Sequence, residues 1–155
     1  PRDVAAIATE VAQMRTRIHE SKPAQGLYET KIGAGRLQEV ELLAQAGALL
    51  ADASDTSTRA GLEAAAEVGL ISDVDADVLK SAASVYYDLH TLVRLLSPQP
   101  LVQDTLGLSA RRFLLRTLDQ PDMATLDQVL RDHYEQCDAI LTNALAGYAA
   151  RGETR

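Results

Sequence analysis

The sequence has no tryptophan and a single cysteine, and aromatic residues make up only 4% of its 155 residues. One cysteine cannot form an internal disulfide, so the fold must be stable without one. With so few aromatic side chains, the hydrophobic core has to come from Ala, Leu, Val and Ile. A composition of this kind favours helices.

Long hydrophobic runs and an excess of basic residues are also missing. No apolar run approaches the roughly 18 residues of a membrane span, so we expect no membrane partner. The 15 basic residues are outnumbered by 22 acidic ones, which gives a formal charge of -7. That is the wrong sign for following a phosphate backbone, so we expect no nucleic-acid partner. No signal peptide is recognisable, which predicts a cytoplasmic protein.

The charge is unevenly distributed along the chain. Residues 1–36 hold six basic and four acidic residues, whereas the remainder is strongly acidic. A solvated helix face with several arginines explains this excess without any function, and a site for anionic groups is the alternative.

The spacing of apolar residues predicts an all-α bundle of about six helices that forms a single domain, residues 1–155. The two or three longest helices should pack nearly antiparallel. In the first, the apolar stripe through Val4, Ile7, Val11, Met14 and Ile18 should face the core, and Gly47 in the second should allow close packing. The expected helices cover residues 3–20, 36–50, 57–69, 72–96, 109–114 and 126–148.

One segment breaks the helical pattern. Residues 27–32 lack a helical period and lead into Gly33-Ala34-Gly35. We therefore expect a short extended segment and a glycine turn near residues 27–35. Ser72 begins a capping box for the fourth helix, and Ser109 is expected to cap the fifth.

Two patterns imitate metal sites. Asp73, Asp75 and Asp77 resemble the start of a calcium loop, but Val78 stands where that loop needs glycine, so these acids are interpreted as helix-capping residues.

His133 and Cys137 lie four residues apart on one helix face, as two metal ligands would. Their neighbours on that face are apolar, which favours a buried thiol in the core. We predict no metal site and no catalytic residue in the chain.

The glycine turn has charged neighbours. It lacks the third glycine of a dinucleotide loop and the Gly-Lys-Ser/Thr ending of a phosphate loop. Lys31 and Arg36 flank it, while Glu39 and Glu41 follow on different faces of the next helix. A phosphate-facing turn and a purely structural turn with ion pairs both remain open.

Residues 28–45, Tyr-Glu-Thr-Lys-Ile-Gly-Ala-Gly-Arg-Leu-Gln-Glu-Val-Glu-Leu-Leu-Ala-Gln, resemble the signature of glutamine synthetase adenylyltransferases. That family has Asp-Leu-Lys, a glycine-rich turn, Asp-Ile-Glu-Phe and Gln at this spacing. The matching positions are Lys31, Gly33, Gly35, Glu41 and Gln45.

The pattern also departs from the family. Arg36 stands where a second consecutive glycine is usual, Glu39 replaces the aspartate, and Leu42 replaces the aromatic residue. The preceding Met14-Arg15-Thr16-Arg17-Ile18 is similar to the family's arginine-rich helix.

The resemblance implies a helical domain that follows a nucleotidyltransferase domain, and the Ala44-Gln45 ending of the signature and the tail after Tyr148 are more similar to the C-terminal, adenylylating half. The parent enzyme would use ATP and magnesium to place AMP on a tyrosine of glutamine synthetase, or remove it by phosphorolysis, under control of glutamine and the PII protein. The catalytic acids, introduced by a Gly-Ser motif, would lie in the preceding domain. No such motif occurs here, so the segment should hold no cofactor and be inactive alone.

The residues that the resemblance assigns to a nucleotide or domain interface are Arg17, Lys31, Gly33, Gly35, Arg36, Glu39, Glu41 and Gln45. The alternatives are a non-catalytic protein-binding or regulatory bundle and the equivalent domain of a PII uridylyltransferase. Convergence of Arg17, Lys31 and Arg36 on one exposed cleft would favour nucleotide contact. A buried glycine turn with internally paired charges would favour a structural role.

Overall fold

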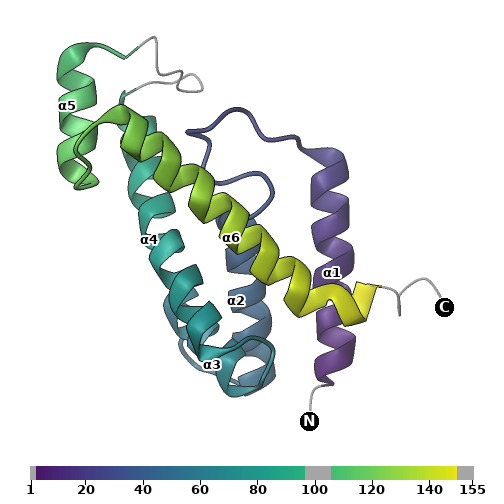
Figure 1. Ribbon diagram of the computed structural model, residues 1–155. Helices are drawn as coiled ribbons and strands as arrows, with labels where there is room; N and C mark the ends of the chain where they lie inside the picture. Colours follow the sequence, from purple (N-terminus) through teal and green to yellow (C-terminus); the bar gives the residue numbers. More distant parts are fainter. Residues whose placement is uncertain (1–2, 97–105, 150–155) are drawn as a thin grey trace.

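The computed structural model describes residues 3–96 and 106–149, and within these ranges the chain is all-α, with no strand. The predicted fold class is therefore confirmed (Figure 1). The two longest helices, α4 and α6, run in opposite senses and cross obliquely (Figure 1). The helices are α1 (Val4–Ser21), α2 (Leu37–Ala51), α3 (Thr58–Glu67), α4 (Asp73–Leu96), α5 (Leu108–Thr117) and α6 (Met123–Ala149).

The helix starts follow from capping chemistry. Side chains of Asp3, Ser57 and Ser72 accept hydrogen bonds from backbone amides in the first turns of α1, α3 and α4. The expected cap of α5 is wrong, because Ser109 lies inside the helix and Gly107 is its N-cap. The helix begins earlier because the Gly107 carbonyl already accepts a helical bond from the Arg111 amide at 3.0 Å.

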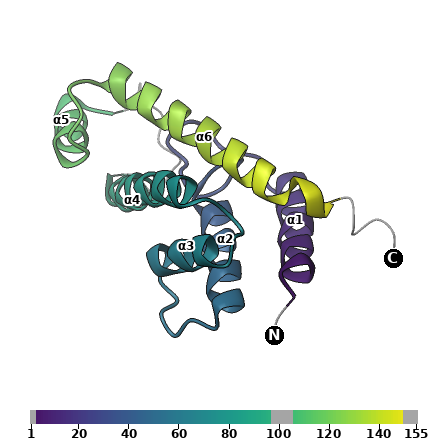
Figure 2. The same cartoon turned by 60° about the horizontal axis from the view of Figure 1, so that its bottom comes forward.

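Helices α2 and α3 pack closely because glycine lies at their contact, and they lie side by side in Figure 2. A Cβ atom on Gly47 would come within 2.6 Å of the Ala65 amide nitrogen, and one on Gly61 within 2.7 Å of the Ala44 carbonyl carbon. The prediction that Gly47 allows close packing is confirmed.

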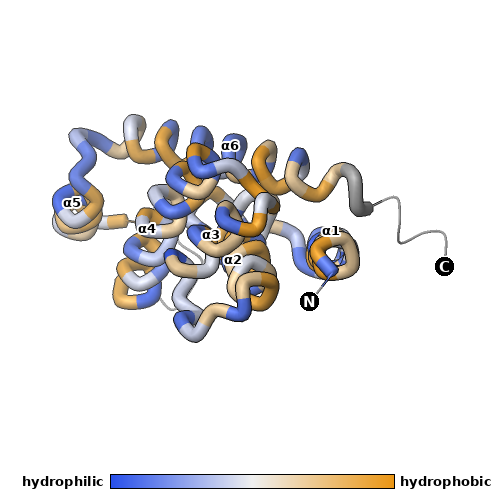
Figure 3. Tube along the Cα trace, turned by 90° about the horizontal axis from the view of Figure 1, so that it is seen from below, coloured by the Kyte–Doolittle hydropathy of each residue, from blue (hydrophilic) through white to orange (hydrophobic). Residues whose placement is uncertain are grey.

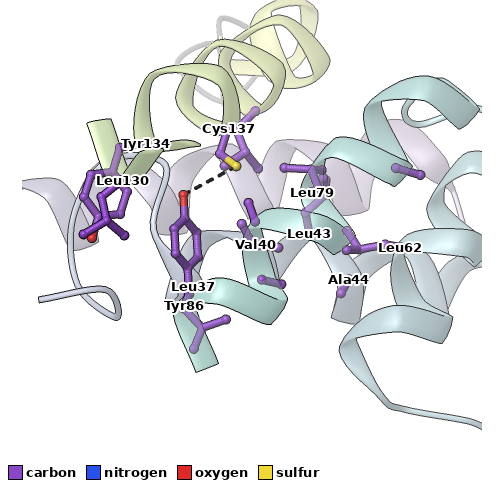
Figure 4. Packing of buried hydrophobic residues seen from close by; sticks show 14 of the residues in the cluster. Leu37, Val40, Leu43, Ala44, Leu62, Leu79, Tyr86, Leu130, Tyr134 and Cys137 are labelled. Carbon is purple, nitrogen blue, oxygen red and sulfur yellow. Dashed lines mark hydrogen bonds between the residues drawn. The ribbon is translucent and has the colours of Figure 1, made fainter. Parts of the chain in front are cut away.

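The core is built of Leu and Ala side chains around α4. Leu79, Tyr86 and Leu89 of α4 are fully buried, and they pack with residues of α2, α3 and α6 (Figure 4). Apolar residues gather between the helices in Figure 3, where α1 and α5 form the two ends of the molecule. In the segment between α1 and α2, Tyr28, Thr30, Gly33 and Gly35 are buried, whereas residues 22–26, Lys31 and Ala34 are exposed.

The expected core face of α1 is right at Val11, which is buried, and at Ile7, which packs against the core, but the buried face is rotated away from Met14. Met14 is 44% exposed and Ile18 is half-buried, whereas Ala8, Val11 and Ala12 are the buried residues. At 100° per residue, Arg15 falls on the same face as Ala8 and Ala12. The small alanines allow close approach to the neighbouring helices, and the polar residues that follow them meet a polar partner.

The segment between α1 and α2 is not a continuous extended strand. Leu27 and Tyr28 form a turn, and bends and a second turn follow through Arg36. A tight turn begins at Gly33, whose carbonyl oxygen accepts a hydrogen bond from the Arg36 amide at 3.2 Å. The glycine turn lies where the sequence predicted it. The residues that precede it are folded instead of extended because they pack against α4 and α6.

Candidate functional site

The glycine turn is fastened to α4 by hydrogen bonds. The Thr30 hydroxyl donates to the Tyr86 carbonyl at 2.9 Å, and the Tyr86 hydroxyl donates to the Gly35 carbonyl at 2.8 Å. Both Thr30 and Tyr86 are fully buried. The turn is therefore anchored to the middle of α4 by a reciprocal pair of buried contacts.

Gly35 has no room for a side chain. Its φ of +69° lies in the left-handed region, and a Cβ atom would overlap the Tyr134 carbonyl oxygen and approach the Asp138 amide nitrogen to 2.7 Å. The turn thus packs directly on the backbone of α6, and glycine is required here on both grounds.

Arg36 faces the protein rather than solvent. Its Nη1 donates to the carbonyl oxygens of Gly26, at 2.7 Å, and of Glu29. Its guanidinium carbon lies 4.1 Å above the centre of the Tyr134 ring, a cation–π contact. The Tyr134 hydroxyl in turn donates to the Leu27 carbonyl at 2.7 Å. Arg36 and Tyr134 together close the folded segment that precedes α2.

A buried carboxylate lies behind the turn. The Glu39 side chain is 1% exposed, and one oxygen accepts from the Gly35 amide at 2.9 Å and from Arg15 Nε at 3.2 Å. Its other oxygen contacts His19 Nε2. A buried carboxylate is stable only when paired and hydrogen-bonded, and here α1 supplies both partners.

Arg15 extends the network to α6. It forms an ion pair with Asp138, and its Nη1 donates to the Thr142 hydroxyl at 2.9 Å. One arginine therefore joins α1 to α2, through Glu39, and to α6. We call Arg15, His19, Glu39 and Asp138 the Glu39 network.

The Glu39 network has no excess of positive charge. Two carboxylates face one guanidinium and one imidazole, so no uncompensated cation is available for an incoming phosphate. Glu39 is also saturated by its donors, which leaves it poorly suited to act as a general base. The arrangement can hold three elements in register, and its chemistry is that of a structural ion-pair network.

Cys137, on α6, lies next to the Tyr86 hydroxyl that anchors the glycine turn. It is fully buried, and its Sγ is 3.6 Å from the Tyr86 hydroxyl (Figure 4). Burial raises the pKa of the Cys137 thiol to about 11, so the thiol is protonated at neutral pH. The prediction of a buried thiol is confirmed.

His133 is half-buried on α6. Its Nδ1 is buried without a hydrogen-bond partner, and burial lowers the pKa of its imidazole. Its ring packs edge-on against Tyr86 at 6.2 Å. Within residues 3–96 and 106–149 no three His, Cys, Asp or Glu side chains are grouped as metal ligands.

The residues expected at an interface divide into two groups. Gly33 and Gly35 are buried in the turn, and Arg36 and Glu39 hold it.

The other four residues turn outward to different degrees. Arg17, Lys31 and Gln45 are exposed, and half-buried Glu41 accepts a hydrogen bond from the Tyr87 hydroxyl. Arg17 Nε lies 3.4 Å from the Gln13 carbonyl of its own helix. Because Arg36 is turned inward, the three cations Arg17, Lys31 and Arg36 do not form one exposed cationic cleft.

Several residues of the site were not singled out from the sequence. Asp138, Tyr86 and Tyr134 come from helices distant in the chain, and nothing in their local sequence marks them. Arg15 and His19 carried a usable signal, because they lie four residues apart on the face defined by Ala8 and Ala12.

Comparison with known proteins adds an independent observation. A protein-family model described as GlnD PII-uridylyltransferase matches residues 8–144. The chain belongs to this family. The matched range of the GlnD-family chain includes the turn, the Glu39 network and Cys137. No helix in the described part of the chain is long and apolar enough to cross a membrane.

Individual proteins that are similar to this GlnD-family chain have a different name from the family model. The chain is 31% identical over 97% of its length to the "bifunctional glutamine synthetase adenylyltransferase/adenylyl-removing enzyme" of Rhodopseudomonas palustris (strain BisB5). An enzyme of the same name from Xanthobacter autotrophicus (strain ATCC BAA-1158 / Py2) is 34% identical over 94% of the chain. The chain spans 16% of the first relative's length and 15% of the second's. The resemblance seen in residues 28–45 is confirmed by this near full-length similarity.

Proposed function

We propose that the chain is the helical domain of a bifunctional glutamine synthetase adenylyltransferase/adenylyl-removing enzyme. The observation that carries this proposal is the similarity to enzymes of that name over 97% of the chain, at 31% identity. In the parent, AMP from ATP is placed on a tyrosine of glutamine synthetase or removed from it, with PII and glutamine as regulators. The assignment to the C-terminal half and the cytoplasmic location stay predictions.

The catalytic centre of the parent is proposed to lie in a preceding nucleotidyltransferase domain. ATP and magnesium would bind there, because phosphoryl-type transfer needs acids that hold the metal ion. The acid that is buried among the described residues, Glu39, is already paired with Arg15 and in contact with His19. The chain's own contribution is to hold the glycine turn and three helices in a fixed arrangement beside the catalytic domain.

We favour a structural role for the glycine turn over a role in which Arg36 contacts phosphate directly. Arg36 is committed to two backbone carbonyls and the Tyr134 ring. Lys31 is exposed and stays a candidate for contact with nucleotide or with the neighbouring domain. We therefore interpret the glycine turn as a non-catalytic part of the chain, within an enzyme whose catalytic centre lies in another domain.

The proposal is tested with the full-length parent and with the 155-residue chain. Purified parent, labelled ATP and magnesium should label glutamine synthetase, and inorganic phosphate should release the label. The chain alone should give no transfer above a control without protein. Transfer of UMP to PII by the parent, without labelling of glutamine synthetase, would support the uridylyltransferase alternative instead. Transfer of AMP by the chain alone would overturn the placement of catalysis in another domain.

A further inference from the structure

Helix α5 is the least integrated helix of the molecule. Of its ten residues only Leu114 is buried. Figures 1 and 3 show it at the end of the molecule opposite α1, beside one end of α4 and the start of α6. The fold described here therefore leaves about half of its circumference uncovered.

The uncovered half combines apolar and cationic side chains. Leu108 is 64% exposed and Phe113 is 48% exposed, and Arg112 and Arg116 are exposed between them. Leu108, Arg112 and Arg116 follow one another at four-residue intervals, so they form one row along the helix, with Phe113 in the next row. We call Leu108, Arg112, Phe113 and Arg116 the α5 patch.

The charge of the α5 patch is opposite to that of the whole chain. Residues 106–118 contain three arginines and no acidic residue, whereas the chain carries a formal charge of -7. The guanidinium groups of Arg112 and Arg116 form no ion pair and no hydrogen bond with a residue that the structure describes. Exposed aromatic and arginine side chains together are typical of protein interfaces, where Arg pairs with carboxylates.

We propose that the α5 patch docks on an acidic surface with an apolar centre, located in another domain of the same parent polypeptide. The proposal rests on the proposed function, because it requires the longer parent. The chain covers only 15–16% of the length of its relatives, so most of such a polypeptide is tethered beside α5 at high effective concentration. Carboxylates on that surface would complement the unpaired charges of Arg112 and Arg116.

Two other occupants fit the α5 patch less well. Two α5 patches facing each other in a symmetric dimer would bring four arginines together, and docking on a different face of a second copy would give a head-to-tail contact, which builds rings or open filaments instead of a symmetric dimer. An anionic lipid surface would gain little from a helix that exposes only two large apolar side chains.

Carbodiimide cross-linking of the full-length parent tests the proposal. In an Arg112→Lys/Arg116→Lys variant, a lysine amine attacks an Asp or Glu carboxyl that the carbodiimide has activated as an O-acylisourea, so that an amide forms and the reagent leaves as a urea carrying the former carboxyl oxygen. We expect an α5 peptide joined to an acidic residue outside the 155-residue chain, in a product of monomer size. The Arg59→Lys variant is the control, because Arg59 lies 3.3 Å from Glu63 on α3 and should cross-link within its own helix.

A second measurement uses charge reversal. In full-length Arg112→Glu/Arg116→Glu, backbone hydrogen exchange of residues 106–118 should be at least about tenfold faster than in the wild type, while exchange in α4 stays unchanged. Conservative replacement by lysine should preserve the slow exchange.

The outcomes against the proposal are distinct. Cross-links from α5 confined to the 155-residue chain, a product of dimer size, or no product while the Arg59→Lys control reacts would each overturn it. Unchanged exchange after charge reversal, or binding of the parent to phosphatidylserine vesicles that is lost in the reversed variant, would also overturn it. A cross-link to another domain in a parent that fails to adenylylate glutamine synthetase would retain the docking surface and reject the proposed function.

Discussion

Gly35 is the residue at which the turn depends most directly on the absence of a side chain. Its left-handed φ and its contact with the backbone of α6 both exclude Cβ. We expect Gly35→Ala to lower the free energy of unfolding by about 2–4 kcal/mol, because left-handed strain adds to a steric overlap with backbone that cannot move freely.

The matched control for this substitution is Gly26→Ala. Gly26 also has a positive φ, of +94°, but nothing lies within 4 Å of the position of its Cβ. The Gly26→Ala variant should lose only the free energy of the left-handed backbone strain, about 1–2 kcal/mol. Urea unfolding of both variants of the chain measures the difference, and equal losses would show that α6 does not enclose Gly35.

The two cations that flank the turn should behave differently. Arg36→Met removes two hydrogen bonds to carbonyls and the cation–π contact, so we expect a loss of about 2 kcal/mol in stability. Lys31→Met removes an exposed charge and should change stability by less than about 0.5 kcal/mol. Urea melts of the two single variants check this split.

The same pair of variants separates stability from function in the parent. If Lys31 contacts phosphate, Lys31→Met should slow AMP transfer by about tenfold or more without loss of stability. Equal stability losses in the two variants would contradict the inward position of Arg36.

At the scale of elements, α1 is held by a polar contact more than by a large apolar face. Its buried residues are Ala8, Val11 and Ala12, which bury little area, and Arg15 and His19 complete the contact through Glu39. The stripe of larger apolar residues lies partly outside the interface. Register between α1 and α2 is therefore set by charge pairing as well as by packing.

Replacing the central carboxylate should loosen α1 first. Glu39→Gln keeps the shape and an acceptor for the Gly35 amide but removes the buried carboxylate that contacts Arg15 and His19, so that Arg15 keeps only the half-exposed Asp138 as its ion-pair partner. We expect a loss of about 3 kcal/mol, as for breaking one side of a buried ion pair. Hydrogen exchange should accelerate in residues 4–21 before it does in α4.

Glu41→Gln is the control for the Glu39 substitution. Glu41 lies two residues further along α2, is half-buried and accepts a bond from exposed Tyr87. Its loss should be below about 1 kcal/mol. A comparable effect of both substitutions would mean that helix propensity, and not the Glu39 network, governs the result.

For the molecule as a whole, the buried Cys137 thiol links stability to alkaline pH. Burial raises its pKa from 9.0 to about 11, so between these values the unfolded chain loses a proton that the folded chain keeps. Stability from this group is complete below pH 9 and is lost as pH rises towards 11. The expected loss is about 2 kcal/mol in that range.

Comparison with Cys137→Ser isolates this effect from the tyrosines. Burial also raises the pKa values of Tyr28, Tyr86 and Tyr134, so the wild type should lose stability further above pH 10 for a separate reason. Urea unfolding from pH 8 to 11 should show a shallower decline in the serine variant. Parallel curves for the two proteins would place Cys137 in contact with water.

The sequence by itself determined the all-α class, the approximate helix ranges, the burial of Cys137 and the family, because each of these depends on local spacing or on a contiguous motif. Periodicity placed α4 and α6, since many apolar residues report one helix face. The resemblance in residues 28–45 needed only neighbouring positions.

Tertiary structure alone decided what the charged residues of the motif do. Local spacing cannot distinguish an arginine aimed at solvent from one aimed at backbone carbonyls, and the Tyr134 ring beneath Arg36 comes from α6, about a hundred residues away in sequence. The rotation of α1 likewise depended on Glu39 of another helix, because a buried carboxylate requires cationic partners more strongly than Met14 requires burial.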